Sequence, residues 1–362
     1  MPTYPRILTV ASAHPRFEYP QADVLRYAQE SILGANWHER PESVETGRQM
    51  ERIFLATKVE RRQSVIELPV YYAHTRGTGA RMAEYATAGY ALGRDAAEHA
   101  LRMVDGRATA ADISDLVVVS CTGYSAPGLD IQIARDLGMP RNVRRLVVGH
   151  MGCFGALVGL RQCLAAVRAN PGATAALLSV ELTSLHFMPT LDPEVLTSFA
   201  LFGDAAAMVL ISLDERADGP ELMGTYCAAD FAAADQMSWT ITDQGFMMGL
   251  SPRVPISLRR GISGVVGELL APHGLTTRDV THWIIHPGGP SILEVIQQKL
   301  ELSDEQMAEN WAVLRAHGNC SSATVLLILE RLLRSGRARH GEWGVMMAFG
   351  PGLTLETALL RF

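Results

Sequence analysis

Residues 149–156 read GHMGCFGA, and this stretch decides the fold because it joins an apolar run to an apolar helix through a glycine-rich turn. The run before it, residues 145–148, predicts a buried strand, and apolar residues recur at helical spacing from 157 to 167. We therefore expect Cys153 at a sharp strand-to-helix turn, where the first N–H groups of the helix lower the pKa of a thiol. From this stretch alone, a buried structural cysteine in a helix contact is the alternative.

Length and composition describe an ordinary globular chain of 362 residues, of which 48% are hydrophobic and 19% charged. It is long enough for one large domain or two fused ones. A net charge of -6 gives no support for binding to nucleic acid or to a membrane surface. No apolar run reaches membrane-spanning length and residues 7–10 are too short for a signal segment, so we expect a cytoplasmic protein.

The cysteine pattern predicts free thiols and no metal site. The chain has five cysteines, at positions 121, 153, 163, 227 and 320. They form no CxxC pair, and no histidine lies near them at the spacing of metal ligands.

The remaining patterns predict alternating helices and strands of an α/β protein. The strand predicted within residues 112–123 contains the unbroken apolar run 116–119, which is typical of sheets covered on both faces. Residues 244–250 predict a strand with Phe246 and Met248 on one face and Met247 on the other. We expect further strands at 7–10, 175–180 and 202–210, and helices at 21–33, 47–57, 84–103 and 130–137.

The second half of the chain repeats the first. Residues 279–289 parallel the stretch from residue 112, with an acidic start, an apolar strand and a glycine-bearing loop. A helix at 291–300 and a turn follow, and then GNCSSA at 318–323 opens another apolar helix. Asp112 precedes Cys153 by 41 residues and Asp279 precedes Asn319 by 40, so Cys153 and Asn319 occupy equivalent places. The duplication predicts two similar halves whose strand ends and helix starts meet at the centre.

Three polar residues are placed by this duplication at the central junction. His286 ends the repeated strand and is followed by a rigid PGGP loop. Together with Cys153 and Asn319 it supplies a nucleophile and two hydrogen-bond donors for an oxyanion. A structural histidine is the alternative for His286 taken alone. His150 and His317 precede Cys153 and Asn319 closely, but we expect them to point away.

Five motifs carry a family resemblance: GCF at 152–154, LFGD at 201–204, WIIHPGGP at 283–290, GNCSS at 318–322 and FGPGLTLE at 349–356. With them the chain resembles the type III polyketide synthases, the chalcone-synthase-like branch of the thiolase superfamily, over essentially its whole length. Cys121 stands where some bacterial members have cysteine and plant members have threonine, so the chain resembles the bacterial type.

The resemblance implies a thiolase-like αβαβα layered fold built from two duplicated βαβα halves. These halves would be residues 1–213, which carry Cys153, and residues 214–362, which carry His286 and Asn319, packed as one unit. It also implies a homodimer that needs no cofactor or metal, because its substrates are an acyl-CoA starter and malonyl-CoA.

The implied reaction is an iterative decarboxylative condensation. Cys153 would hold the starter as a thioester, with an imidazolium at His286 keeping the thiol ionised. His286 and Asn319 would stabilise the enolate left by decarboxylation of malonyl-CoA, and the enolate would attack the Cys153-bound acyl group. Repeated cycles would give a polyketide that cyclises to an aromatic or pyrone product.

The resemblance further implies a substrate cavity. Phe202 would be the gate between the CoA tunnel and the cavity, with a core phenylalanine as the alternative. The other expected lining residues are Cys121, Thr183, His186, Met248 and Ser321.

Arg52 would bind the CoA phosphates. Ala56 stands where the family has a lysine, and the neighbouring Lys58, Arg61 and Arg62 either compensate for it or form a solvated helix end.

Two other functions compete with this reading. A single-condensation ketoacyl synthase III would share the Cys-His-Asn trio. A catalytically silent thiolase-fold partner subunit would have lost one of the three, and all are present. A cysteine hydrolase is disfavoured, because the apolar, glycine-lined site suggests exclusion of water.

Overall fold

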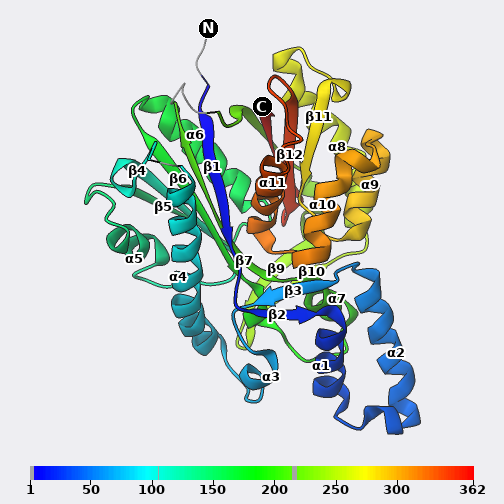
Figure 1. Ribbon diagram of the computed structural model, residues 1–362. Coiled ribbons are helices and arrows are strands. Elements are labelled where there is room, and N and C mark those ends of the chain that lie inside the picture. Colours follow the sequence, from blue (N-terminus) through cyan, green and yellow to red (C-terminus); the bar gives the residue numbers. More distant parts are fainter. Residues whose placement is uncertain (1–3, 105, 214–217) are drawn as a thin grey trace.

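The computed structural model describes residues 4–104, 106–213 and 218–362. At its centre lies a nine-stranded sheet in the order β11-β12-β13-β8-β1-β7-β6-β4-β5 (Figure 1). The first half supplies β1 (Arg6–Ala13), β4 (Ile113–Ser120), β5 (Arg144–Gly149), β6 (Thr174–Leu182) and β7 (Asp204–Ser212). The second half supplies β8 (Glu221–Ala229), β11 (Val280–Ile285), β12 (Trp343–Gly350) and β13 (Thr354–Arg361).

The pairing of the strands repeats between the two halves, as the sequence predicts. In the first half β1 pairs antiparallel with β7, β7 antiparallel with β6, and β6 parallel with β4. In the second half β8, β13, β12 and β11 pair in the same order and with the same directions. The half-sheets meet where Arg6 on β1 pairs with Glu221 on β8, and these side chains form an ion pair of 2.6 Å. The predicted boundary after residue 213 falls beside residues 214–217, which lie outside the described residues.

Five layers result from this arrangement. Helix α4 (Thr78–Met103) covers one face of the first half-sheet, and its small residues allow a close approach to the strands. The helices α6 (Gly155–Ala169) and α11 (Thr324–Ser335) lie between the half-sheets. On the outer face of the second half-sheet lie α8 (Val254–Leu270) and α9 (Pro290–Leu300). The strands therefore bury side chains on both faces, and the predicted αβαβα layering is confirmed.

Smaller elements surround this centre. Helix α1 (Gln21–Leu33) has its predicted bounds, whereas α2 (Pro41–Ala56) and α4 each begin six residues before the predicted start. The strands β9 (Met237–Thr242) and β10 (Gly245–Leu250) form a hairpin, in which Phe246 and Met248 are buried and Met247 is 40% exposed, as the alternation predicts. The other elements are β2 (Phe17–Pro20), β3 (Arg61–Ser64), α3 (Leu68–Tyr71), α5 (Leu129–Asp136), α7 (Pro193–Leu201), α10 (Asp304–His317) and the short 3₁₀ helices η1 (Trp37–Glu39), η2 (Ala110–Asp112), η3 (Thr183–His186), η4 (Phe231–Gln236), η5 (Ala271–His273), η6 (Thr277–Asp279) and η7 (Ser321–Ala323).

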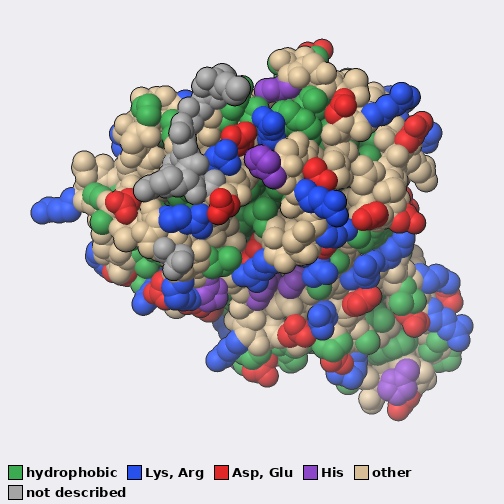
Figure 2. All heavy atoms as spheres, turned by 45° about the horizontal axis from the view of Figure 1, so that its top comes forward, with side chains coloured by type: hydrophobic (Ala, Val, Ile, Leu, Met, Phe, Trp, Pro, Cys, Tyr) green, Lys and Arg blue, Asp and Glu red, His purple; other side chains and the backbone are tan. Residues whose placement is uncertain are grey.

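The surface carries charges of both signs. On the face that Figure 2 shows, Lys and Arg side chains alternate with Asp and Glu side chains over the whole outline. This mixture agrees with the modest net charge of -6 and gives no support on this face for a polyanionic partner.

Strand β5 corrects one prediction. The apolar run that predicts a buried strand forms the outer edge of the sheet, with β4 as its paired neighbour. Leu146 is 43% exposed and Val147 is 52% exposed. The run is apolar and yet uncovered within the chain, which is uncommon for an edge strand.

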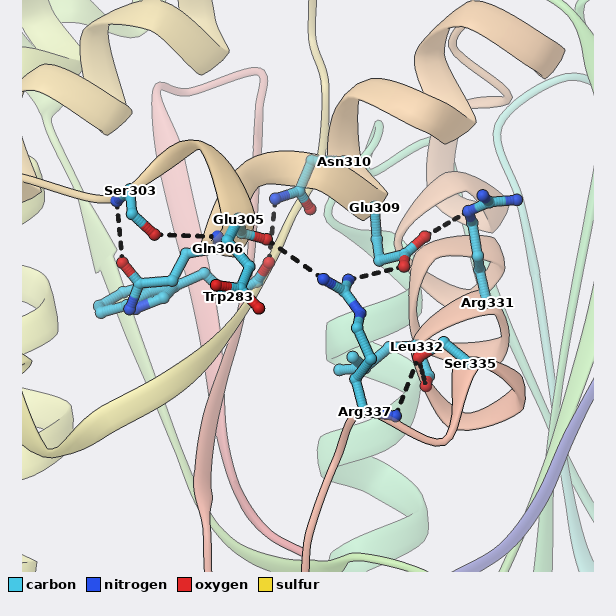
Figure 3. A network of polar contacts seen from close by, with 10 residues as sticks. All are labelled: Trp283, Ser303, Glu305, Gln306, Glu309, Asn310, Arg331, Leu332, Ser335 and Arg337. Atoms are coloured by element: carbon cyan, nitrogen blue, oxygen red, sulfur yellow. Dashed lines mark hydrogen bonds and ion pairs between the residues drawn. The ribbon is translucent and has the colours of Figure 1, made fainter.

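The outer edge of the second half-sheet, at β11, is covered by side chains of a helix. Where a turn is predicted after residue 300, α10 packs along β11. Its Asn310 donates a hydrogen bond of 3.0 Å to the Trp283 carbonyl (Figure 3). Asn310 also accepts one of 2.8 Å from the Ile285 N–H, and Gln306 donates to the Val280 carbonyl. These side chains occupy the edge that a further strand would need, and they fix the end of β11.

Candidate active site

Cys153 lies in the predicted turn between β5 and α6. His150, with φ of 56°, and Gly152, with φ of 89°, both adopt left-handed backbone conformations there. A Cβ atom at Gly152 would lie 2.5 Å from Cδ of Pro351, so this close approach requires glycine. The turn leaves the Cys153 side chain 7% exposed, next to the start of α6.

His286 follows the last residue of β11 and is fully buried, with 0% exposure. Its backbone N–H donates to the Met347 carbonyl at 2.9 Å, and its ring packs edge-on against Phe349 at 6.1 Å between centroids. Among the described residues, neither ring nitrogen has a hydrogen-bond partner. A buried polar atom without a partner is costly, so these nitrogens indicate a place for a bound polar group.

Asn319 is held against the end of α7. Its backbone N–H donates to the Leu201 carbonyl at 2.9 Å, and its Oδ1 accepts from the Ser321 N–H at 2.8 Å. With Oδ1 occupied, the amide nitrogen remains to donate, and the side chains of Asn319 and Ser321 lie near enough to the Cys153 thiol to lower its pKa.

The turn at 349–351 connects two of the three predicted residues in space. Phe349 contacts the ring of His286, and a Cβ atom at Gly350 would lie 3.4 Å from the Cys153 nitrogen. The end of β11 and the start of α6 therefore meet around one turn.

Burial controls the ionisation of this site. It raises the pKa of Cys153 to about 12, although hydrogen bonds from Ser321 and Asn319 act in the opposite direction. It also lowers the pKa of His286 to about 3. Desolvation therefore works against the expected thiolate and imidazolium, while the start of α6 favours the thiolate.

A cavity of about 360 Å³ opens in front of Cys153. Five of the predicted lining residues lie in its wall: Cys121, Thr183, Phe202, Met248 and Ser321. The remaining wall residues are Thr122, Gly152, Met237, Trp239 and Pro351, which the sequence did not identify. Two of the predicted residues also hold the backbone in place. Cys121 Sγ accepts from the Gly152 N–H at 3.0 Å, and Thr183 donates to the Gly203 carbonyl at 2.8 Å.

His186 lines an adjoining cavity instead. That space of about 620 Å³, part of it open to solvent, shares Thr183, Phe202, Trp239 and Met248 with the first. His186 donates from Nε2 to the Thr122 carbonyl at 2.7 Å, and its Nδ1 accepts from the Phe246 N–H at 3.1 Å. Burial lowers its pKa to about 4, so this ring is neutral and engaged with the backbone.

The basic residues separate into different roles. Arg52 is exposed on α2, pairs with Glu45 at 2.7 Å and does not line the cavity in front of Cys153. Lys58 pairs with Glu294 at 2.6 Å. Arg62 lies in β3, is 4% exposed and donates to the carbonyl of Phe202 at 2.7 Å. Arg62 therefore has neither of the two expected roles. Its side chain is too buried to replace a lysine that binds the CoA phosphates, and it is not part of a solvated helix end because α2 ends at Ala56.

Sequence reasoning missed two buried carboxyl groups. Glu181 on β6 accepts from the Cys121 N–H at 3.0 Å and from the hydroxyl groups of Thr122 and Ser322. It thereby joins the Cys121 loop of the first half to the segment that follows Asn319. Asp204 accepts from the backbone of Val65 and Ser184 and holds the loop after Phe202. The sequence signal that could have revealed Glu181 and Asp204 was a single acidic residue in an otherwise apolar strand.

The two neighbouring histidines point away from the thiol, as expected. His150 bonds to Tyr124 and to the Trp239 carbonyl. His317 stacks on His14 with ring centroids 4.4 Å apart and bonds to Gln63 at 2.8 Å.

Comparison with known proteins identifies the class. The chalcone and stilbene synthase N-terminal domain matches residues 48–215, and the C-terminal domain of the same family matches residues 230–362. The chain therefore belongs to the chalcone and stilbene synthase family.

Individual relatives show which kind of enzyme within this family the chain resembles. A 1,3,6,8-tetrahydroxynaphthalene synthase of Streptomyces peucetius subsp. caesius is 36% identical over 82% of this chain and 80% of its own. A 3,5-dihydroxyphenylacetyl-CoA synthase of Streptomyces toyocaensis is 30% identical over 100% of this chain and 91% of its own. The crystal structure of PKS-I from the brown alga Ectocarpus siliculosus has a TM-score of 0.91 and 28% identity, and covers 100% of this chain and 99% of its own. The protein is a type III polyketide synthase, an acyltransferase with a thiolase-like fold, as the motifs predict.

Two further properties concern the described residues. They contain no group of three or more His, Cys, Asp or Glu side chains that could hold a metal ion. Within the same ranges, no helix is both long and apolar enough to cross a membrane.

Proposed function

We propose that Cys153 receives an acyl group from a CoA thioester and that malonyl-CoA units extend it in the cavity in front of this thiol. The observation that carries the proposal is the fully buried imidazole of His286, with both nitrogens unpaired, which packs on Phe349 at the turn whose Gly350 approaches Cys153. A thioester carbonyl supplies the missing acceptor. Two relatives support an aromatic or pyrone product: the tetrahydroxynaphthalene synthase and the alpha-pyrone synthesis polyketide synthase-like Pks18 of Mycobacterium tuberculosis.

Loading begins from the neutral pair. As Sγ of Cys153 attacks the thioester carbon, its proton moves to the imidazole of His286, so the two charges form together and compensate each other. The tetrahedral oxyanion accepts a hydrogen bond from the Asn319 amide. The CoA thiolate then leaves and takes the proton from His286, which restores the neutral imidazole.

Extension uses the same groups. The malonyl thioester carbonyl binds between His286 and Asn319, which stabilise the enolate as carbon dioxide leaves. The enolate carbon attacks the acyl carbon on Cys153 and expels the Cys153 thiolate, which carries the negative charge of the former malonyl carboxylate. One proton taken up from solvent then restores the thiol. The apolar wall excludes water, which would otherwise hydrolyse the acyl group. No step requires a metal or a further cofactor.

Arg52 is our candidate for the CoA phosphates. Its guanidinium group is exposed, so it can exchange Glu45 for a phosphate without a desolvation penalty. We place the enzyme in the cytoplasm, where CoA thioesters are available.

A product assay separates this proposal from its competitors. Purified protein is incubated with malonyl-CoA and a panel of acyl-CoA starters, and products are identified by mass spectrometry. We expect products that contain more than one malonyl unit. A product with a single unit, formed only from a carrier-protein substrate, would favour a ketoacyl synthase III. An absence of any acyl adduct would favour a silent partner subunit.

The edge of β5 supports a homodimer. Leu146 and Val147 are exposed on a strand whose outer edge is open, and the exposed Met151 follows them. A second copy of the chain covers these apolar side chains.

Replacing Val147 with lysine is expected to convert the dimer into a monomer, because the charge would be buried without a partner in the interface. Size-exclusion chromatography with light scattering measures the mass. Ile256→Lys, at another exposed apolar position on α8, is the control and should remain dimeric. A Val147→Lys protein that stays dimeric would contradict this interface.

Met248 is expected to control product length. Its side chain is 8% exposed and lies in the wall of the cavity that contains Cys153. Met248→Ala removes flexible atoms from this wall and should shift products toward longer chains or admit bulkier starters. Met247→Ala, on the opposite face of β10, is the matched control and should leave the product profile unchanged. Identical profiles for both variants and wild type would remove Met248 from the functional wall.

A further inference from the structure

Five aromatic rings fasten the β9–β10 hairpin to the loops that follow β4 and β5. Neighbouring rings in this cluster have centroids 4.3 to 6.1 Å apart. Its members are Tyr124, His150, His186, Trp239 and Phe246. The hairpin carries three wall residues of the Cys153 cavity, namely Met237, Trp239 and Met248. The cluster therefore connects the cavity wall to the turn that holds the nucleophile.

His150 bridges two elements within the cluster. Its Nε2 lies 2.6 Å from the Trp239 carbonyl oxygen, and its Nδ1 lies 2.9 Å from the Tyr124 hydroxyl. A carbonyl can only accept, so Nε2 carries the proton and Nδ1 accepts from the hydroxyl of Tyr124. Both nitrogens are thus satisfied by a single neutral tautomer.

The backbone of His150 is in an unfavourable conformation. Its φ of 56° lies in the left-handed region, which costs a non-glycine residue about 1 kcal/mol or more. A glycine would meet no such cost, and the residue before it is already Gly149. The side chain must therefore supply an interaction that glycine lacks, and the two hydrogen bonds are that interaction.

Two hydrogen bonds of Trp239 attach the β9–β10 hairpin to the two segments next to Cys153. Nε1 of Trp239 donates to the Cys121 carbonyl at 2.7 Å, and the Trp239 carbonyl accepts from His150, three residues before Cys153. Trp239 is thus bonded through its indole nitrogen to the Cys121 loop and through its carbonyl oxygen to the turn that contains Cys153. His150 itself does not line the cavity, so any effect on substrate passes through Trp239.

We propose that His150 is a positioning residue for product specificity. It fixes the hairpin wall at a set distance from Cys153, and this distance limits how far the bound chain grows and folds before it cyclises. The inference rests on the proposed function, because it concerns a polyketide grown on Cys153.

Three variants test the proposal: His150→Gly, Tyr124→Phe and the double variant. Glycine accepts the left-handed backbone, so His150→Gly removes the tether without adding strain. Hydrogen exchange measured by mass spectrometry should show faster exchange in the peptide 237–250, by about fivefold for a hydrogen bond worth about 1 kcal/mol. The peptide 155–169 of α6 should exchange as in wild type.

The same variants are assayed with hexanoyl-CoA and malonyl-CoA. Loading of hexanoyl on Cys153, measured on the intact protein, should proceed at the wild-type rate in His150→Gly. The ratio of shorter to fully extended products should change by about fivefold. Tyr124→Phe should have a smaller effect that disappears in the His150→Gly background, since both changes act on one tether. Ile256→Ala, at an exposed position on α8 outside the ring cluster, is the control and should match wild type.

Several results would overturn the proposal. An unchanged exchange rate at 237–250 together with an unchanged product ratio in His150→Gly would do so, as would additive effects of the two substitutions. If His150→Gly does not fold, Tyr124→Phe keeps every ring and decides alone, by the same two measurements. If wild type loads no acyl group, the proposed function fails, whereas the exchange measurement still decides whether the tether exists.

Discussion

Replacing Cys153 with alanine is expected to abolish acyl loading and all product formation while the protein remains folded. The side chain is small and nearly buried, so its loss removes one sulfur atom and little packing. The neighbouring thiol of Cys121 is bonded to the backbone of Gly152, whereas Asn319 and Ser321 both lower the pKa of Cys153. Intact-protein mass spectrometry after incubation with acyl-CoA should show one adduct on wild type and none on the variant.

Cys163→Ala provides the matched control. This thiol is also buried and lies on α6, but it packs in the core between the half-sheets. Its variant should load like wild type. An adduct of equal yield on Cys153→Ala, for example on the neighbouring Cys121, would overturn the assignment of the nucleophile.

His286→Ala and Asn319→Ala are both expected to lose malonyl-CoA decarboxylation. Loss of a single oxyanion donor typically lowers turnover by about a hundredfold to a thousandfold. The two variants should differ in loading, because His286 also takes the proton of the thiol while Asn319 can only donate. Asn319→Ala should therefore retain some starter loading and His286→Ala should not. Release of labelled carbon dioxide and intact mass measure the two steps.

A conservative variant separates the two roles of His286. The side-chain amide in His286→Gln can donate a hydrogen bond but cannot accept the thiol proton. We expect it to recover decarboxylation relative to His286→Ala and to remain defective in loading. Decarboxylation at the wild-type rate in Asn319→Ala would show that Asn319 is not the oxyanion donor.

The duplicated core and the positions of Cys153 and Asn319 within it could be predicted because each depends on local spacing. The intervals of 41 and 40 residues place Cys153 and Asn319 at equivalent helix starts, and the structure has them there. The alternation over β10 predicts the buried face of Met248 for the same reason, since side chains on a strand alternate with a period of two.

Other features depend on contacts between distant segments. The run at 145–148 is apolar whether its cover comes from the same chain or from another copy, so its sequence cannot distinguish a central strand from an edge strand. Arg62 looks like part of a surface cluster, but the left-handed turn at Lys58 carries the chain into β3 and buries it. The ionisation of Cys153 depends on total burial, which the helix start alone does not reveal.

The two outer edges of the sheet differ, because β11 is covered by side chains and β5 is open, and this difference affects how copies of the chain can assemble. A sheet with two open ends can add copies at both ends and grow into a fibre of unlimited length. Here Asn310 and Gln306 close the β11 end with side-chain hydrogen bonds and leave only the β5 end available. A sheet with one usable end can join one other sheet and then stops, so the loss of symmetry between the two edges would limit growth to the proposed pair.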